Sequence, residues 1–212
     1  MNIKAAIEEI YGAGGATIVF DGILNQQLFN AAPFKVLWIL REPWFKETWD
    51  MLQSEGIYNR IGSSPTWHPM FYVTFSILNG FPKWNEMKYI REQPDMAEVL
   101  RSVAYVNVKK SVGGTSSHLK EIHSWFKKGE EIIKFQLSEC TPDIVIGCPP
   151  FMQEIFKWDK ERSSPIKHGI VSFVSNTGKP LLIEAPHPSH RGKREVYVNT
   201  IVEVIQAGLK SS

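Results

Sequence analysis

The run Val36-Leu37-Trp38-Ile39-Leu40 leads directly into Arg41-Glu42-Pro43. Apolar residues that follow one another without alternation are typical of a strand covered on both faces, as in a parallel sheet flanked by helices. We therefore expect a buried strand over residues 34–40. Proline cannot continue the ladder of hydrogen bonds, so Glu42 falls at the carboxyl end of this strand.

Other apolar runs occur at residues 103–108, 143–147, 170–174 and 180–183, and patterns with helical spacing separate them. This alternation predicts the α/β class, as a three-layer α/β/α sandwich around a mainly parallel sheet of about four strands. Asp21-Gly22, between residues 16–20 and 23–29, predicts an additional N-terminal β-hairpin. The helical patterns fall over residues 44–55, 67–78, 95–100, 119–126, 130–137 and 151–158, with an amphipathic helix at the C-terminus.

Composition limits the function classes. The chain has 212 residues, 43% of them hydrophobic, which fits one domain over residues 1–212 with residues 1–33 as an N-terminal extension. A net charge of +2 gives no global basic field. Two cysteines are too few for a cysteine-ligated iron–sulfur cluster or an all-cysteine zinc site. With no signal peptide or 18-residue apolar segment, we expect a soluble cytoplasmic monomer without a membrane partner.

Polar and catalytic residue types follow the predicted strands. Glu42 follows the first strand, Asn107 lies on the second, Gly147 with Pro149 follows the third, and His187 follows the fourth. Because the carboxyl ends of parallel strands share one edge of a sheet, these residues are expected to line one cleft.

Three of these segments, in this order, resemble motifs of the uracil-DNA glycosylase superfamily. Leu40-Arg41-Glu42-Pro43-Trp44-Phe45 is similar to its first motif, in which a carboxylate precedes proline. Val106-Asn107-Val108 matches the strand that ends in a base-reading asparagine, and His187-Pro188-Ser189 matches the final motif. The resemblance extends from about residue 34 to the C-terminus.

The resemblance implies a DNA glycosylase that hydrolyses the N-glycosidic bond of uracil or a related damaged base. Glu42 would orient water and stabilise the cationic sugar, and His187 would donate to the departing base, so these two are the candidate catalytic residues. Asn107 can match uracil N3–H and O4 together, because its amide holds both an acceptor and a donor. Trp44, Trp67 and Phe71 are candidates to shape the pocket or stack on the base, although core packing is the ordinary role of such rings.

The implied partner is DNA, single- or double-stranded. The candidates for holding its phosphates are Ser189, His190, Arg191, Lys193, Arg194 and Lys109. No metal site and no cofactor are expected, because the histidines show no convincing metal spacing.

The chain departs from the family pattern at several positions. Leu40 replaces a glycine, glutamate replaces aspartate at position 42, and Arg191 stands near the position of a leucine that fills the gap left by the flipped base. These departures keep two alternatives open. One is a nucleic-acid-binding module with the same fold and no activity, and the other is an enzyme or binder of free nucleosides or bases.

Overall fold

The protein is described by a computed structural model covering residues 2–12, 15–43, 49–50, 64–114, 118–157, 170–174, 180–189 and 192–210. Its centre is a six-stranded sheet in the order β2-β5-β3-β6-β8-β7. The four inner strands are parallel to one another, and β2 and β7 add antiparallel edges. The strands are β2 (Gly22–Ile23), β3 (Val36–Leu40), β5 (Ala104–Asn107), β6 (Ile144–Gly147), β7 (Val171–Val174) and β8 (Leu181–Glu184). The predicted α/β class and mostly parallel sheet are confirmed.

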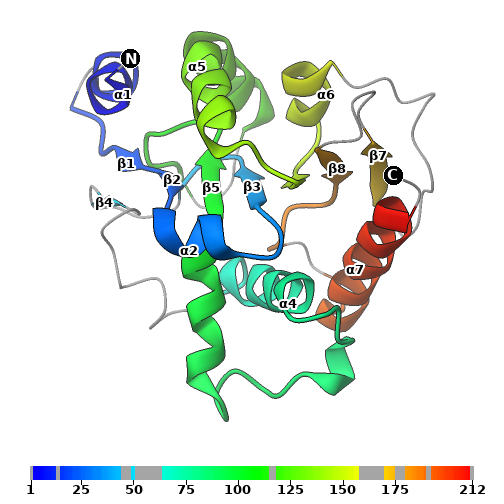
Figure 1. Ribbon diagram of the computed structural model, residues 1–212. Helices are drawn as coiled ribbons and strands as arrows, with labels where there is room; N and C mark the ends of the chain where they lie inside the picture. Colours follow the sequence, from blue (N-terminus) through cyan, green and yellow to red (C-terminus); the bar gives the residue numbers. More distant parts are fainter. Residues whose placement is uncertain are drawn as a thin grey trace.

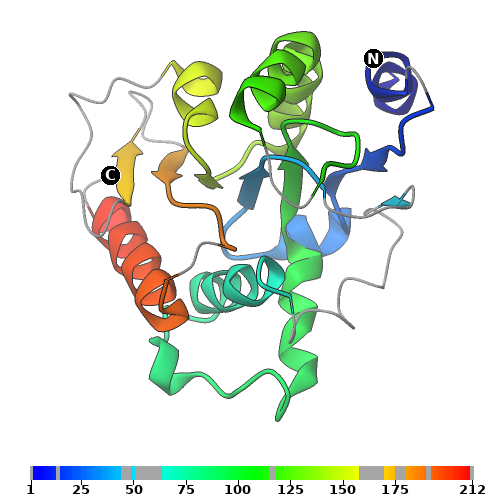
Figure 2. The same ribbon diagram turned by 180° about the vertical axis from the view of Figure 1, so that it is seen from behind.

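Helices lie on both faces of this sheet (Figures 1 and 2). Helices α5 (Leu119–Cys140) and α6 (Phe151–Phe156) cover one face, and α4 (Trp67–Leu78) and α7 (Arg194–Lys210) cover the other. Strand β3 serves both cores, because side chains alternate along a strand. Leu37 and Ile39 pack under α5 and α6, whereas Trp38 and its even-numbered neighbours pack against α4 and α7.

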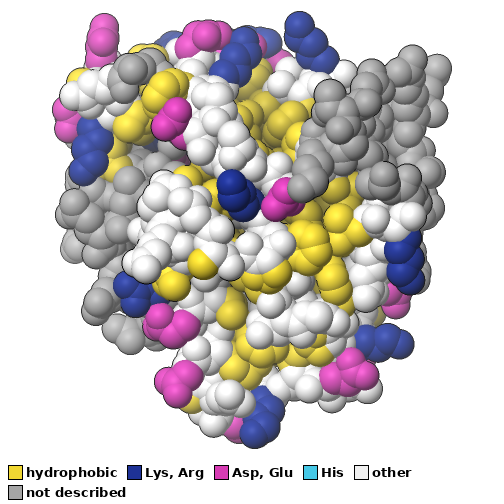
Figure 3. Space-filling view, viewed as in Figure 1, with side chains coloured by type: hydrophobic (Ala, Val, Ile, Leu, Met, Phe, Trp, Pro, Cys, Tyr) yellow, Lys and Arg dark blue, Asp and Glu magenta, His cyan; other side chains and the backbone are white. Residues whose placement is uncertain are grey.

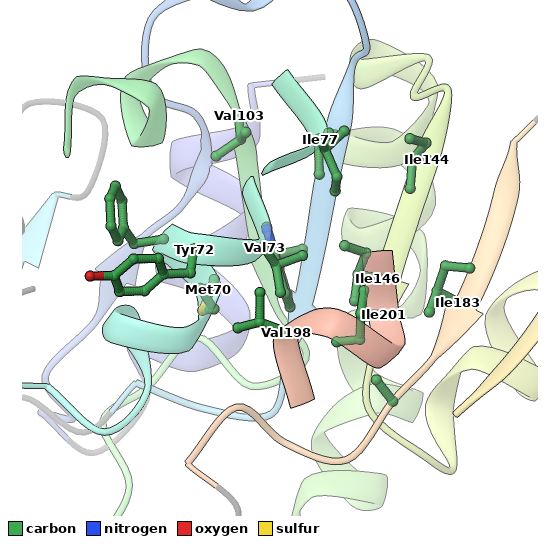
Figure 4. Packing of buried hydrophobic residues seen from close by; sticks show 14 of the residues in the cluster. Met70, Tyr72, Val73, Ile77, Val103, Ile144, Ile146, Ile183, Val198 and Ile201 are labelled. Carbon is green, nitrogen blue, oxygen red and sulfur yellow. The ribbon is translucent and has the colours of Figure 1, made fainter. Parts of the chain in front are cut away.

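The core between α4, α7 and the sheet is continuous (Figure 4). Val73 and Ile77 of α4 and Ile201 of α7 meet Ile146 of β6 there, and all four are at most 1% exposed. The indole Nε1 of Trp38 donates to Thr74 Oγ1 at 3.2 Å, which satisfies a polar atom that burial would otherwise leave without a partner.

Helix α1 (Ile3–Tyr11) packs on α5 rather than on the sheet. The Asn2 side chain caps it by accepting from the Ala5 amide at 3.3 Å. The Tyr11 ring stacks on Trp125 with centroids 5.2 Å apart, and its hydroxyl donates to the Val108 carbonyl at 3.1 Å. One aromatic side chain therefore joins α1, α5 and the segment after β5.

The predicted N-terminal hairpin is not formed. Strand β1 (Val19–Phe20) pairs in parallel with β4 (Trp49–Asp50), while β2 pairs with the edge of β5. Residues 26–29, predicted to end the second strand of the hairpin, lie in helix α2 (Gln26–Ala31), because the Asn25 side chain caps the first turn by accepting from the Leu28 amide at 3.0 Å. The pairing of β2 with β5 and the Asn25 cap of α2 thus outweigh the local preference of Asp21-Gly22 for a hairpin turn.

Several helix boundaries also differ from the prediction. The patterns over residues 119–126 and 130–137 belong to one helix, α5, that runs through Gly129. Residues 95–100 lie in a 3-10 helix, η2 (Pro94–Ser102), and a shorter one, η1 (Trp84–Glu86), precedes it. The helix predicted over residues 44–55 falls almost wholly outside the described residues. None of the described helices is both long and apolar enough to cross a lipid bilayer.

Gly129 offers a test of how α1 docks. A Cβ at this position would meet the Tyr11 hydroxyl closer than real atoms approach. We expect Gly129→Ala to lower the free energy of unfolding by roughly 1–3 kcal/mol, the usual cost of overpacking. Tyr11→Phe should relieve part of this cost in the double variant, although alone it loses the hydrogen bond to Val108, worth about 1 kcal/mol.

Urea unfolding of the two single variants and the double variant measures this coupling. Gly114→Ala is the matched control, since a Cβ there meets nothing within 4 Å. Strictly additive effects of Gly129→Ala and Tyr11→Phe would contradict the proposed contact.

Candidate functional site

The four parallel strands end abreast at one edge of the sheet. In register, Leu40 lies beside Asn107, Ile39 beside Gly147, and Gly147 beside Glu184. The chain passes from β3 to β5 on one side and returns to β6 on the other, so the strand order reverses around β3. In open α/β sheets a crevice forms outside the carboxyl ends at such a reversal, and ligands bind there.

Glu42 lies just beyond β3, beside the segment that follows β5. The Lys109 amide donates to the Arg41 carbonyl and the Gly113 amide donates to the Pro43 carbonyl, both at 2.9 Å. These bonds extend the pairing of the two strands past their ends. Gly113 then packs so closely on the Glu42 carboxylate that a Cβ at position 113 would displace it.

Lys109 binds two carboxylates at once. Its ammonium lies 2.9 Å from Glu42 Oε2 and 2.8 Å from Glu121 Oε1. The Glu42 and Lys109 side chains are 6% and 8% exposed, whereas Glu121 is 49% exposed. Burial lowers the pKa of Lys109, but its bonds to Glu121 and Glu42 outweigh burial and leave that pKa above its ordinary value. Lys109, predicted to hold a DNA phosphate, is thus already engaged by protein carboxylates.

Asn107 lies at the end of β5 and is 2% exposed. Its backbone N–H and its side-chain Nδ2 both donate to Asp21 Oδ2, at 2.6 and 3.0 Å. The amide predicted to read a base is therefore bound on one side to a buried carboxylate. Among the described residues its Oδ1 has no hydrogen-bond partner.

His187 follows β8 and is half-buried. Its Nδ1 accepts from the Ser189 amide at 3.2 Å and lies 2.7 Å from the Ser189 hydroxyl. Burial, and then the neighbouring Arg41 guanidinium, lowers the pKa of His187 to about 4. The imidazole is consequently neutral at pH 7, and because Nδ1 accepts, its proton is on Nε2.

The two described aromatic candidates lie in the core. Phe71 is fully buried, with its ring 4.6 Å from that of Tyr72, and Trp67 is 6% exposed with its edge on Tyr105. Neither ring has a free face for a stacked base in this conformation. Core packing, the ordinary role of such residues, is what the structure shows for both.

The candidate phosphate contacts lie partly within and partly outside the described residues. Ser189, Lys193 and Arg194 are exposed around the start of α7. Trp44, His190 and Arg191 lie outside the described residues. On the face seen in Figure 3, the coloured acidic and basic side chains are interspersed around the rim. No field of one sign gathers among the described side chains of that face.

Sequence reasoning missed three residues that support the site. Asp21, Lys110 and Gln136 are buried and hydrogen-bonded to one another. The sequence predicts Asp21 only as a turn residue, and it indicates no role for Lys110 or Gln136. A charged residue beside an apolar run is too common a signal to identify a partner 89 residues away. Arg41 belongs to the first motif, but nothing in its local sequence indicates that it lies near His187.

Other chemistries receive no support from the described residues. No group of three or more His, Cys, Asp and Glu side chains among them is arranged to hold a metal ion. Cys148 follows β6, and burial raises the pKa of its thiol to about 12, which makes it a poor nucleophile. A hollow of about 480 Å³ lies at the opposite edge of the sheet, where Asp143 and Pro180 precede β6 and β8.

No protein-family model matches the chain, and the comparison with curated proteins gave no match. The site must therefore be interpreted from its own geometry.

The buried ion pair between Lys109 and Glu42 can be tested through its effect on stability. Lys109→Met leaves the Glu42 carboxylate buried without its cation, so we expect a loss of about 3–5 kcal/mol in the free energy of unfolding. Adding Glu42→Gln should restore most of this loss, because the uncompensated charge is then removed. Urea unfolding of the single and double variants checks this expectation.

Glu121→Gln is the matched control, because it removes the exposed partner of the same ammonium. It should cost at most about 1 kcal/mol. Equal losses for Lys109→Met and Glu121→Gln would show that burial of Glu42 is not what makes the pair important.

The buried His68 predicts how the stability of the protein depends on pH. His68 of α4 is fully buried against Tyr72, and neither ring nitrogen has a hydrogen-bond partner among the described residues. Burial, followed by the charges of Arg194 and Arg91, lowers the pKa of His68 from 6.5 to about 4. The unfolded chain therefore binds one more proton than the folded chain between these values, so stability falls as pH drops from 6.5 to 4.

His68→Leu, a similar volume without a proton site, should remove roughly 3 kcal/mol of this acid sensitivity. Unfolding free energies measured from pH 7 to pH 4 test it, with exposed His118→Gln as the control that keeps the wild-type slope. A slope unchanged by His68→Leu would contradict the assignment.

Proposed function

We propose that this protein is a divergent member of the uracil-DNA glycosylase superfamily, with a three-layer α/β/α sandwich, and that it hydrolyses the N-glycosidic bond of uracil or a related damaged base in DNA. The observation that carries the proposal is the state and position of the His187 imidazole. This imidazole is neutral, has its tautomer fixed by Ser189, and lies at the same sheet edge as the buried Glu42 carboxylate.

The reaction separates charge, and His187 suits the base side of it. Breaking the bond leaves cationic character on the sugar and negative charge on the departing base. With Nδ1 occupied by the Ser189 amide, Nε2–H is the donor that remains for a base carbonyl oxygen. A donor fixed before the reaction needs no reorganisation as charge develops. The nearby Arg41 adds a positive charge on this side.

Glu42 suits the sugar side. It follows β3, which is separated from β8 by one strand, so the two strand ends stand about 10 Å apart across the sheet. A nucleotide extruded from the stack can lie along this edge, with its sugar toward Glu42 and its base between His187 on the β8 side and Asn107 on the β5 side. The exposed residues Ser189, Lys193 and Arg194 then supply contacts for flanking phosphates.

The test is excision of uracil from single- and double-stranded oligonucleotides, read as strand cleavage after alkali. We expect Glu42→Gln to lower the rate about 10²–10⁴-fold and His187→Gln to lower it about 10²–10³-fold. Since the pKa of His187 is about 4, the wild-type rate should show no ionisation of an ordinary histidine between pH 5 and pH 8.

Glu98→Gln, which alters an exposed ion pair with Arg101 in η2, is the control and should retain full activity. The proposal is rejected if folded wild-type protein cleaves no uracil or other deaminated or oxidised base under conditions in which a known glycosylase does.

A second candidate function, nucleic-acid binding without turnover, is favoured by the Lys109–Glu42 ion pair, which compensates the carboxylate that catalysis would use. It predicts salt-dependent binding of oligonucleotides, unchanged by Glu42→Gln, with no base released. Excision that disappears in Glu42→Gln rules this candidate out.

A further inference from the structure

The carboxylate of Asp21 is fully enclosed and accepts hydrogen bonds from three side chains and one backbone amide. Oδ2 accepts from the backbone N and the Nδ2 of Asn107, at 2.6 and 3.0 Å. Oδ1 accepts from Lys110 Nζ at 2.7 Å and from Gln136 Nε2 at 2.9 Å. The Asp21 and Lys110 side chains are both 0% exposed. This cluster lies next to the sheet edge at which Glu42 and His187 are found.

Asp21 determines which way the Asn107 amide faces. An ionised carboxylate can only accept, so the nitrogen of the amide must point toward it and Oδ1 must point away. Because Oδ2 also accepts the backbone N–H of the same residue, it lies on the backbone side of the amide and meets the Nδ2 proton nearest Cβ. The second Nδ2 proton and Oδ1 then stand side by side on the outer edge of Asn107.

We propose that Asp21 is a positioning residue for base recognition. It holds Asn107 so that an acceptor and a donor are presented together to a base with an N–H group beside a carbonyl. Uracil offers this edge, whereas cytosine offers the opposite pattern at the same atoms. The inference rests on the proposed function, which places Asn107 against the base, and it adds a residue outside the three motifs.

Lys110 and Gln136 keep Asp21 in place. Gln136 Nε2 also donates to the Asp21 backbone carbonyl at 2.9 Å, and Gln136 Oε1 accepts from Lys110 Nζ at 2.8 Å. The carboxylate is thus fixed at both oxygens and at its own backbone. A buried ion pair adds little net stability compared with apolar residues of the same volume. The cluster is better explained by the orientation that it imposes on Asn107 than by the stability that it adds.

Two double variants distinguish a role of Asp21 in orienting Asn107 from a role in core packing alone. Asp21→Leu with Lys110→Met removes the acceptor and its buried cation together, so no lone charge remains. Asp21→Asn with Lys110→Met restores a neutral carbonyl acceptor at the same place. Tyr11→Phe is the control, because it removes a bond from the same N-terminal segment to Val108 and leaves the four hydrogen bonds to the Asp21 carboxylate in place.

The first measurement is hydrogen exchange of the Asn107 side-chain amide by NMR, which needs no activity. In the wild type one Nδ2 proton should exchange much more slowly than in an exposed asparagine. Asp21→Leu/Lys110→Met should lose this protection by about tenfold or more, and Asp21→Asn/Lys110→Met should keep it. The second measurement is kcat/KM for uracil against cytosine in single-stranded DNA. The ratio of kcat/KM for uracil to kcat/KM for cytosine should fall about tenfold or more in Asp21→Leu/Lys110→Met. It should stay unchanged in Tyr11→Phe.

The outcomes are distinct. If the wild type excises no base, the proposed function fails, and amide exchange still decides whether Asp21 positions Asn107. If the leucine variant folds and neither exchange nor discrimination changes, the positioning role is overturned. If that variant does not fold, equal and rapid exchange of both Nδ2 protons in the wild type overturns it, and slow exchange of one proton that persists in the asparagine variant supports it.

Discussion

The buried carboxylate of Asp21 holds together the edge of the sheet at which the candidate site lies. It joins the N-terminal segment, the end of β5 and helix α5 through hydrogen bonds to Asn107, Lys110 and Gln136. A charge with no exposure to water is tolerated only where such partners surround it. Residues 21–23 therefore have to lie along the outer edge of β5, and this requirement explains why β2 pairs with β5 and forms no hairpin with β1.

The consecutive lysines after β5 extend this constraint in two directions. Lys110 turns inward to Asp21, and Lys109 reaches across the end of β3 to Glu42. Each cation thus compensates an acid from another element, and the two ion pairs fix residues 108–114, which follow β5, against both neighbours. Gly113, which leaves room for the Glu42 carboxylate, completes this arrangement. The loop that the proposed substrate must approach is consequently held by buried charges as well as by backbone bonds.

Local patterns in the sequence were sufficient to predict the sheet. Val36–Leu40 and Ile144–Gly147 are continuous apolar runs, and both are buried strands, as their lack of alternation indicates. Contacts between distant residues could not be predicted in this way. Asp21-Gly22 is a strong turn signal, but its partners are 86 to 115 residues away, and no periodicity records such a pairing. The burial of Lys109 and Lys110 could not be predicted either, because a lysine bound to a buried carboxylate has the same local sequence as an exposed one.

The distribution of charge at this edge determines which side suits the departing base and which suits the sugar. It also makes the availability of Glu42 depend on Lys109. On the β8 side a neutral imidazole lies near the Arg41 guanidinium, a setting that favours negative charge on a departing base. On the β3 side the Glu42 carboxylate shares the Lys109 ammonium with Glu121, so Lys109 weakens its field on a cationic sugar without cancelling it. A further anion bound by Lys109 would loosen its hold on Glu42 and leave that carboxylate more available to the sugar. Glu121 holds the same ammonium from a half-exposed position, and a DNA phosphate is an anion that the proposed substrate would bring to that place. In the proposed reaction, availability of the carboxylate is therefore coupled to binding of the nucleic-acid backbone, which would make the enzyme far weaker on a free nucleoside than on DNA.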